Sequence, residues 1–438
     1  MRPLTYARVD EELLDVMARP GRGYYVLVGI NLIVLAVGLF AWRYQILTGL
    51  GVAGISHPVA WGLYITNFVF WIGIAHSGTL ISAILYLFRS RWRTAVHRSA
   101  EAMTLAALLT GGLFPLIHLG RPWYFYWLIP YPDRGLLWPN FRSPLLWDVF
   151  AIGTYFLVSL LFFFFGLIPD LAAARYRVSG LRRRLYTLFS LGWQGTDREW
   201  QHYRAAYLLL AGLATALVVS VHSVVSWDFA VALVPGWHST LFAPYFVAGA
   251  IHSGLAMILT LLVPLRRVLS LHAYLTAHHF EAIAKLLVLT GLILGYAYGA
   301  EYFTAWYGRD PVEWESLRYR AVGREAWAFY LMAAFNVGVP LLFCSRSIRM
   351  RPALLWSCSL LINVGMWLER FVIITTSLGH EFIPFTWGGY VPTWVEVSIT
   401  AGGFAWFFLW YLLFVKGVPV ISLSEMKEQF WKEASHER

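Results

Sequence analysis

Apolar runs of about 20 residues recur ten times along the chain, and shorter polar segments that carry most of the charges separate them. A helix needs about 20 apolar residues to cross the roughly 30 Å hydrocarbon layer of a membrane. The runs lack the two-residue alternation of barrel strands, so we predict an all-α polytopic membrane protein. The predicted transmembrane helices lie near residues 25–43, 58–88, 99–118, 144–168, 205–227, 241–265, 280–303, 324–345, 353–377 and 393–415.

Composition agrees with this class and limits the chemistry of the chain. Hydrophobic residues make up 59% of the 438 residues and charged residues only 13%, a balance too apolar for a water-soluble domain. The two cysteines, Cys344 and Cys358, form no C-x-x-C pair. We therefore expect the chain to hold no metal, iron–sulfur cluster or attached haem by itself.

The basic residues predict the orientation of the chain in the membrane. If the N-terminus is cytoplasmic, 24 of the 34 lysines and arginines lie in segments on the inner side. This bias places both termini in the cytoplasm. Basic segments such as Arg89 to Arg93 then act as anchors at the lipid surface, so the net charge of +10 requires no nucleic-acid partner.

An internal repeat divides the chain into two similar units. The segment IAHSGTLISAIL (Ile74 to Leu85) resembles AIHSGLAMILTLL (Ala250 to Leu262), and the helix after each holds a glutamate near its start, Glu101 in HRSAEAM or Glu281 in HHFEAIAK. Spans two to five and six to nine are therefore predicted to form two parallel four-helix bundles. The predicted units are 1–57 with the first span, 58–229 and 230–378 as the two bundles, and 379–438 with the last span and a cytoplasmic tail.

Ionisable residues within the spans are functional candidates, because burying them in a membrane costs several kcal/mol unless they are paired or hydrated. A structural role remains open for each of them. Glu281 and Lys285 are four residues apart and can neutralise each other, whereas the adjacent Glu369 and Arg370 are expected to point to different faces. We place His76 and His252 near mid-membrane, Glu101, Glu281 and Lys285 toward the inside, and His118, Asp148, His222, Glu369 and Arg370 toward the outside.

The segment LFPLIHLGRPWYFYWL, Leu113 to Leu128, suggests a binding site at the outer rim. His118 ends the third span and Asp148 begins the fourth, so both flank one loop. A histidine beside a carboxylate can take protons from a hydroxyl near neutral pH, and the aromatic surroundings suit an amphipathic substrate such as quinol. Alternatively, the aromatic residues around Arg121 form an ordinary interfacial belt and His118 only caps a helix.

Two other classes of membrane protein also fit these residues. A haem-b cytochrome would use His76 with His252, or His118 with His222, as axial ligands. A transporter with parallel repeats would bind its substrate at mid-membrane, near His76 and His252. The clustering of aromatic and polar residues at one rim favours the quinol site.

Five motifs, in order, resemble the NrfD-like family of quinone-interacting membrane subunits, which includes the membrane subunit of polysulfide reductase. They are IAHSGTLISA, LIHLGRPWYFYWLIPYP, SPLLWD, VHSVVSWDFA and NVGMWLERFVI, and the similarity covers roughly residues 20–415. Within the family, the chain is most similar to the larger NrfD-like subunit of alternative complex III, a bacterial quinol oxidase complex.

This resemblance implies a subunit of a respiratory or photosynthetic complex in the bacterial inner membrane. It would oxidise menaquinol or ubiquinol near the outer face, with coupled proton translocation, and bind no haem or metal itself. The implied partners are an iron–sulfur subunit at the outer face, c-type cytochrome subunits and a second NrfD-like subunit. A quinone-reducing membrane anchor of a molybdopterin-type oxidoreductase is the alternative.

The resemblance also implies roles for individual residues. His118 and Asp148 match the proposed quinol-binding positions and are the expected catalytic pair. The further quinol-binding candidates are Arg121, His76, Trp123 and Tyr124. The expected proton path comprises His76, Glu101, His222, His252, Glu281, Lys285, Glu369 and Arg370.

Two outer loops are expected to receive the partner. Residues 119–143 and 303–323 are long for connections within a helix bundle. The second loop mixes Trp306, Trp314 and Tyr319 with charges of both signs, as the rim of a docking surface does.

Overall fold

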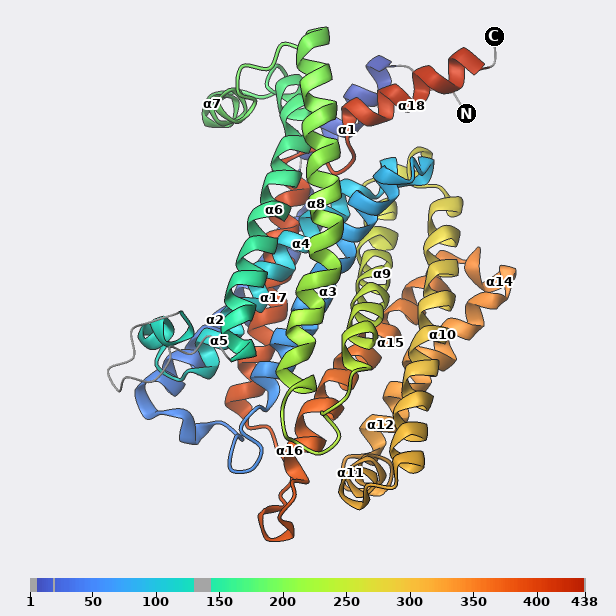
Figure 1. Ribbon diagram of the computed structural model, residues 1–438. Coiled ribbons are helices and arrows are strands. Elements are labelled where there is room, and N and C mark those ends of the chain that lie inside the picture. Colours follow the sequence, from blue (N-terminus) through green and yellow to red (C-terminus); the bar gives the residue numbers. More distant parts are fainter. Residues whose placement is uncertain (1–5, 19, 130–142, 437–438) are drawn as a thin grey trace.

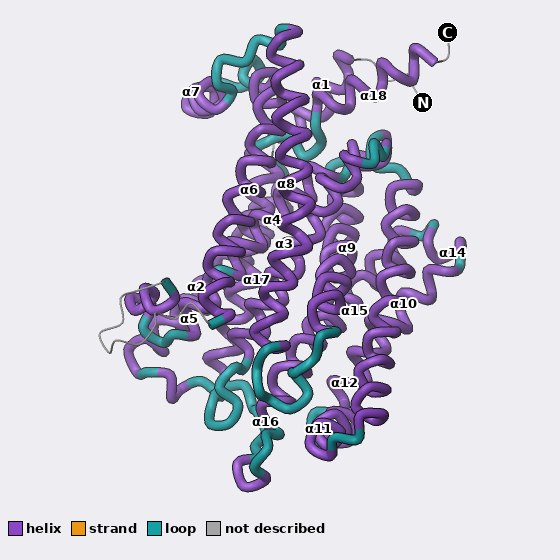
Figure 2. Tube along the Cα trace, viewed as in Figure 1, coloured by secondary structure: helices purple, strands orange, loops and turns teal. Residues whose placement is uncertain are grey.

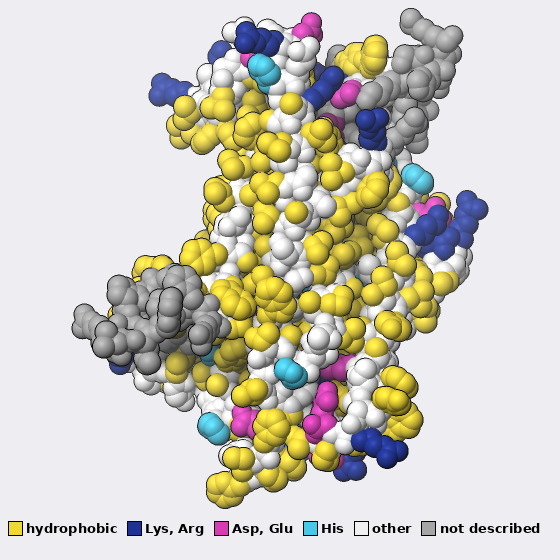
Figure 3. Space-filling view, viewed as in Figure 1, with side chains coloured by type: hydrophobic (Ala, Val, Ile, Leu, Met, Phe, Trp, Pro, Cys, Tyr) yellow, Lys and Arg dark blue, Asp and Glu magenta, His cyan; other side chains and the backbone are white. Residues whose placement is uncertain are grey.

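Ten helical stretches in the computed structural model are long and apolar enough to cross a membrane, which confirms the predicted all-helical, multi-pass fold. The structure describes residues 6–18, 20–129 and 143–436, and no strand occurs among them (Figure 2). Hydrophobic side chains form a wide band across the molecule, whereas Lys and Arg gather toward its ends (Figure 3). This distribution is the one that a hydrocarbon layer requires.

The spans include three interrupted helices (Figure 1). Pro115 lies just after the break in the third span, and the eighth and ninth spans each contain a π-helical turn. The spans are α2 (Arg22–Thr48), α3 (Leu63–Leu87), α4 (His97–Gly111) with α5 (Leu113–His118), α6 (Pro144–Ala174), α8 (Asp197–Ala230), α9 (Phe242–Val268), α10 (Ala277–Gly308), α12 (Ala326–Ala333) with η5 (Ala334–Gly338), α13 (Val339–Leu341) and η6 (Leu342–Cys344), α15 (Pro352–Phe371) with η7 (Val372–Thr376) and α16 (Ser377–Gly379), and α17 (Trp394–Gly417).

Short helices lie at the two ends of the bundle (Figure 1). The terminal face carries both chain ends together with α1 (Tyr6–Ala18), η2 (Arg91–Ala95), α7 (Gly180–Phe189), η4 (Leu271–Ala273), α14 (Arg346–Arg349) and α18 (Leu423–His436). The opposite face carries η1 (Leu50–Val52), η3 (Pro122–Leu128), α11 (Pro311–Val322) and η8 (Pro384–Thr386). Both termini therefore lie on one side, as an even number of spans requires.

Helices α3 and α9 form the centre of the molecule. Helix α3 packs against α4, α8 and α9, while α9 packs against α8, α10 and α15. Helices α2 and α17 pack on each other, and α17 also packs on α4. We call the helices of residues 58–229 the first bundle and those of 230–378 the second bundle, and the division of the chain into these units remains a prediction.

The repeated His-Ser-Gly segments meet where α3 and α9 cross. A Cβ atom added at Gly254 would lie only 2.0 Å from Cβ of Ser77, and one added at Gly73 would lie 3.5 Å from Oγ of Ser253. Small residues allow two membrane helices to approach closely. The repeat thus supplies a close contact between the two central helices.

Gly254→Ala should destabilise the protein by about 1–3 kcal/mol, because the new methyl group forces α3 away from α9. The melting temperature of the purified protein in detergent measures this effect. Gly153→Ala on α6 is the matched control, since no atom lies within 4 Å of its added Cβ. Equal melting temperatures for the two variants would contradict this account of the crossing.

Candidate functional site

His118 lies at the opposite face, at the end of α5. Its ring meets the Tyr64 ring of α3 edge-on, with centroids 6.4 Å apart. Tyr64 donates a hydrogen bond to Oε1 of Gln45 on α2, and Nε2 of Gln45 donates to the Ile117 carbonyl at 3.0 Å. Three helices thus fix the position of His118. Its Nδ1 is buried and has no hydrogen-bond partner among the described residues.

Asp148 lies on the first turns of α6, which begins at Pro144, a residue suited to that position. Its side chain is 4% exposed and lies beside the carboxyl group of Asp228 near the end of α8. Within the described part of the chain, both oxygens of Asp148 and Oδ1 of Asp228 are buried without a hydrogen-bond partner. Two buried carboxyl groups side by side repel when both are ionised, which favours a shared proton.

The predicted pair of His118 and Asp148 is not joined directly. No hydrogen bond or ion pair links the two side chains in the ranges that the structure describes. Most of the loop between them, residues 130–142, lies outside the described residues. The helix η3, which follows His118, lies against α6.

Aromatic side chains surround this end of α6 and α8. Trp123 and Tyr124 on η3 are 54% and 38% exposed, and Arg121 before them is also exposed. The rings of Trp147 and Trp227 meet edge-on with centroids 6.0 Å apart, next to Asp148 and Asp228 in sequence. Sequence reasoning missed Asp228, although it stands in a quoted motif directly after a tryptophan.

A histidine pair occupies the middle of the first bundle. The His76 ring lies 4.5 Å from the His222 ring and 4.7 Å from the Tyr155 ring, measured between centroids. His76 Nδ1 lies 2.5 Å from the Ile72 carbonyl oxygen, whereas Nε2 of His76 and both nitrogens of His222 lack partners among the described residues. The expected outer position of His222 is wrong, because α8 brings it to the depth of His76.

The third histidine of this region belongs to the second bundle. His252 Nδ1 lies 2.7 Å from Oγ1 of Thr290 on α10, and its Nε2 is buried without a partner among the described residues. Several buried ring nitrogens are thus open to water or another ligand. Such groups require an explanation, since nearly all buried polar atoms in proteins are hydrogen-bonded.

A chain of hydroxyl groups leads from His76 toward the terminal face. The Tyr155 hydroxyl lies 2.9 Å from Oγ1 of Thr79, and Thr79 lies 3.3 Å from Ser159 and 3.5 Å from Thr104. Thr104 stands one helical turn from Glu101 on α4. Sequence reasoning missed these residues, because Ser and Thr are common in membrane helices, where they bond to the backbone.

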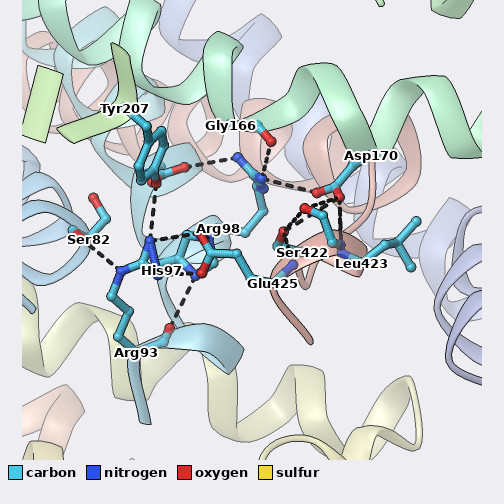
Figure 4. Close-up of polar contacts among 12 residues, drawn as sticks. Ser82, Arg93, His97, Arg98, Gly166, Asp170, Tyr207, Ser422, Leu423 and Glu425 are labelled. Atoms are coloured by element: carbon cyan, nitrogen blue, oxygen red, sulfur yellow. Dashed lines mark hydrogen bonds and ion pairs between the residues drawn. The ribbon is translucent and has the colours of Figure 1, made fainter. Parts of the chain in front are cut away.

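A buried cluster of charges near the terminal face includes Arg98, Asp170 and Glu425 (Figure 4). Glu101 belongs to this cluster. It accepts hydrogen bonds from Arg98 at 3.2 Å and from the Tyr207 hydroxyl at 3.1 Å. Arg98 also binds Asp170 on α6 at 3.1 Å. Asp170 in turn accepts backbone hydrogen bonds from residues 423 and 424 at the start of α18.

Glu425 on α18 joins this cluster through Arg93. The Arg93 guanidinium donates to Glu425 at 2.8 Å and to the Tyr207 hydroxyl at 3.3 Å. Burial raises the pKa of the Glu425 carboxyl group, and the positive charge of Arg93 opposes this shift. The C-terminal helix is therefore fixed to the buried charges of the first bundle.

Glu281 and Lys285 occupy a different environment. They form an ion pair of 3.2 Å on α10, and Glu281 also pairs with Arg349 at 3.4 Å. The Lys285 side chain is 60% exposed. Although the sequence repeat aligns Glu281 with Glu101, only Glu101 is deeply buried. Their predicted roles in a common proton path stay predictions.

Glu369 and Arg370 pair with each other at 3.1 Å, contrary to the expectation that they point to different faces. The long arginine side chain turns back and also lies 4.2 Å above the Phe246 ring on α9. Glu369 further accepts a hydrogen bond from Tyr298, and Asn336 in the π-helical turn η5 donates to both of these residues. This arrangement connects α10, α12 and α15 at mid-bundle.

The described residues contain no group of three or more His, Cys, Asp or Glu side chains suited to a metal ion. Cys344 is exposed and Cys358 is buried, and neither forms a disulfide. The candidate site therefore offers proton-accepting groups and aromatic surfaces.

Three curated proteins resemble this chain over much of its length. A protein of Halobacterium salinarum, assigned as a membrane subunit of dimethyl sulfoxide reductase, is 28% identical over 87% of this chain and 87% of its own. A selenate reductase subunit of Mesobacillus selenatarsenatis is 26% identical over 51% of this chain and 53% of its own. The Hdr-like menaquinol oxidoreductase integral membrane subunit of Archaeoglobus fulgidus is 23% identical over 91% and 93%.

The match to a protein family covers most of the helix bundle. Residues 51–380 match the family described as polysulphide reductase, NrfD. This range contains the two bundles together with His118, Asp148 and the buried histidines. The chain belongs to the NrfD family of polysulphide reductase membrane proteins.

Proposed function

We propose that this chain is the quinol-binding membrane subunit of an electron-transfer complex and oxidises quinol at the opposite face. The observation that carries this proposal is the set of buried, unpartnered polar atoms on His118, Asp148 and Asp228. They lie where the helices meet an aromatic rim, so an apolar ligand with polar ring substituents fits them. The names of the relatives, two of which are reductase subunits and one a menaquinol oxidoreductase subunit, support a quinone-linked role.

The proposed reaction removes two protons and two electrons from quinol and leaves quinone. Nδ1 of His118 accepts one proton from a quinol hydroxyl, and the paired carboxyl groups of Asp148 and Asp228 accept the other. Arg121, Trp123 and Tyr124 contribute to the rim over the quinol ring. The two electrons pass to an iron–sulfur partner subunit at this face.

The complex that fits best is alternative complex III in a bacterial inner membrane. It would supply c-type cytochrome subunits and a second NrfD-like subunit. The terminal face, with α1, α7 and α18, is then cytoplasmic, as the distribution of basic residues favours. The alternative, a quinone-reducing anchor of a molybdopterin enzyme, would use the same residues to deliver protons to quinone.

Exposed aromatic side chains at the opposite face support the docking of a partner there. Trp306 near the end of α10 is 61% exposed and Trp314 on α11 is 37% exposed. Phe385 is 96% exposed on η8, in a loop that projects beyond the helix ends (Figure 1). The loop around η8 was not expected from the sequence, which pointed only to residues 119–143 and 303–323.

Purification of the tagged chain from native membranes in mild detergent tests the function and its direction. We expect an iron–sulfur subunit and c-type cytochromes to copurify, and chemical crosslinks to join the iron–sulfur subunit to α11 and the η8 loop. Crosslinks from the iron–sulfur subunit to α7 instead would show that the orientation of the chain in the membrane is the reverse of the proposed one. Copurification of a molybdopterin subunit without cytochromes would refute quinol oxidation and support the alternative, a quinone-reducing anchor.

We further propose that the first bundle conducts protons. His222, His76, the hydroxyl chain at Tyr155 and Thr79, and Glu101 form a series of titratable or hydroxylic groups from mid-bundle to the terminal face. His252, Glu369 and Arg370 extend the polar core into the second bundle. Glu281 and Lys285 lie near the surface and are the weaker members of the predicted path.

A further inference from the structure

A cavity of about 670 Å³ opens near the terminal face, away from the quinol site. Its walls come from the end of α3, the start of α8 and the C-terminal helix α18. The volume is within the range of about 300–1,000 Å³ that is typical of sites for small molecules. Arg93, Tyr207 and Glu425, which belong to the charge cluster of Figure 4, contribute to its lining.

The lining changes from apolar to charged along α3 and α8. Leu87 and Leu208 are 39% and 52% exposed, in the apolar parts of these helices. Trp200 and Tyr203 follow toward the start of α8, and such rings prefer the membrane–water interface. Arg89 lies just beyond the end of α3, and Arg204 lies on the first turns of α8. A ligand in this cavity would place a hydrocarbon chain at the depth of lipid acyl chains and a polar group at the depth of lipid headgroups.

Two arginines of the lining are available to a ligand. Arg204 is 63% exposed and pairs only loosely with Glu428, at 3.9 Å. The Arg89 guanidinium makes no hydrogen bond or ion pair within the described part of the chain. Its backbone has a φ of 52°, a left-handed conformation that is uncommon for a large side chain and often marks a functional position.

The other charges of the lining are already balanced. Arg93 uses its donors on Glu425, on Tyr207 and on the Ser82 carbonyl at 3.1 Å. The lining contains three arginines and two glutamates, so one negative charge would neutralise it. A phosphodiester carries one negative charge, and guanidinium groups bind phosphate oxygens through paired hydrogen bonds.

We propose that this cavity binds a phospholipid of the cytoplasmic leaflet. Arg89 and Arg204 hold the phosphodiester, and an acyl chain lies along Leu87 and Leu208. The apolar wall favours a lipid over free phosphate, which would leave that wall unused. Since α18 forms one wall, the bound lipid also holds the C-terminal helix against the bundle.

Native mass spectrometry of the delipidated complex, titrated with phosphatidylglycerol, tests this site. The double variant Arg89→Gln with Arg204→Gln should bind the lipid about thirtyfold more weakly, as expected for two arginines near the lipid surface. The control, Arg183→Gln with Arg184→Gln on α7, removes the same charge from exposed positions outside the cavity. Equal lipid binding by the double variant and the control would overturn the proposal.

Two further titrations identify the part of the ligand that is recognised. Diacylglycerol with the same acyl chains but no phosphate should bind the complex much more weakly than phosphatidylglycerol. Inorganic phosphate at millimolar concentration should not displace the lipid, and displacement would identify a free-phosphate site instead. If the double variant does not assemble, Arg89→Gln alone should still weaken lipid binding about fivefold, and unchanged binding would refute the site.

Discussion

His118→Ala, or Asp148→Asn, should lower quinol oxidation by the assembled complex by about 10²-fold or more, the usual scale for losing a general base. Each change removes a buried proton acceptor that has no protein partner among the described residues. Asp228→Asn should also lower the rate, because the remaining acid at position 148 would lose the neighbour that shares its proton. Steady-state turnover with a soluble quinol analogue measures these effects.

The control for this series is His202→Ala, an exposed histidine near the terminal end of α8. It should leave turnover unchanged. The variants at 118 and 148 must retain the partner subunits, which size-exclusion chromatography verifies. Near-normal turnover in both intact variants would show that His118 and Asp148 do not take part in quinol oxidation, and it would refute the proposed reaction.

The number and approximate limits of the spans were predictable because membrane thickness fixes the length of an apolar helix. All ten predicted spans overlap the ten helical stretches of the structure. The interruptions within spans were not predictable, because a π-helical turn such as η7 has no periodic signal of its own in the sequence. The ion pair between Glu369 and Arg370 also escaped prediction, since an ideal helix separates adjacent side chains by about 100°.

The candidate site was predictable only as a set of residues at one rim. His118 and Asp148 stand in recognisable motifs, but the carboxyl group beside Asp148 is that of Asp228, 80 positions later in the chain, and only the packing of α6 on α8 brings them together. The same limit applies to Arg98 and Asp170. Long-range pairs of this kind leave no periodic signal in a single sequence.

The repeat predicted equal roles for Glu101 and Glu281, and the structure separates them. Glu101 is buried and hydrogen-bonded to Tyr207, whereas Glu281 forms an ion pair with the largely exposed Lys285. Sequence similarity between repeats conveys the helix position of a residue. It does not convey its burial, which for Glu101 depends on contacts with α8, such as the hydrogen bond from Tyr207.

Glu101→Gln should therefore abolish the part of proton translocation that exceeds the protons released by quinol itself, while quinol oxidation continues. The amide keeps most of the shape and hydrogen bonding of the acid but cannot titrate. Tyr155→Phe should act in the same direction, because it removes the hydroxyl beside Thr79 and keeps the ring that stacks on His76. The proton-to-electron ratio of the complex in sealed proteoliposomes measures both effects.

Glu281→Gln is the matched control, since it makes the same chemical change at the corresponding position of the second repeat. We expect it to keep the normal ratio, because its carboxylate lies near the surface beside Lys285 and Arg349. A ratio that falls equally in both glutamate variants would support a path through both bundles. An unchanged ratio in Glu101→Gln and Tyr155→Phe, accompanied by lower melting temperatures, would show that these groups only stabilise the polar core of the first bundle.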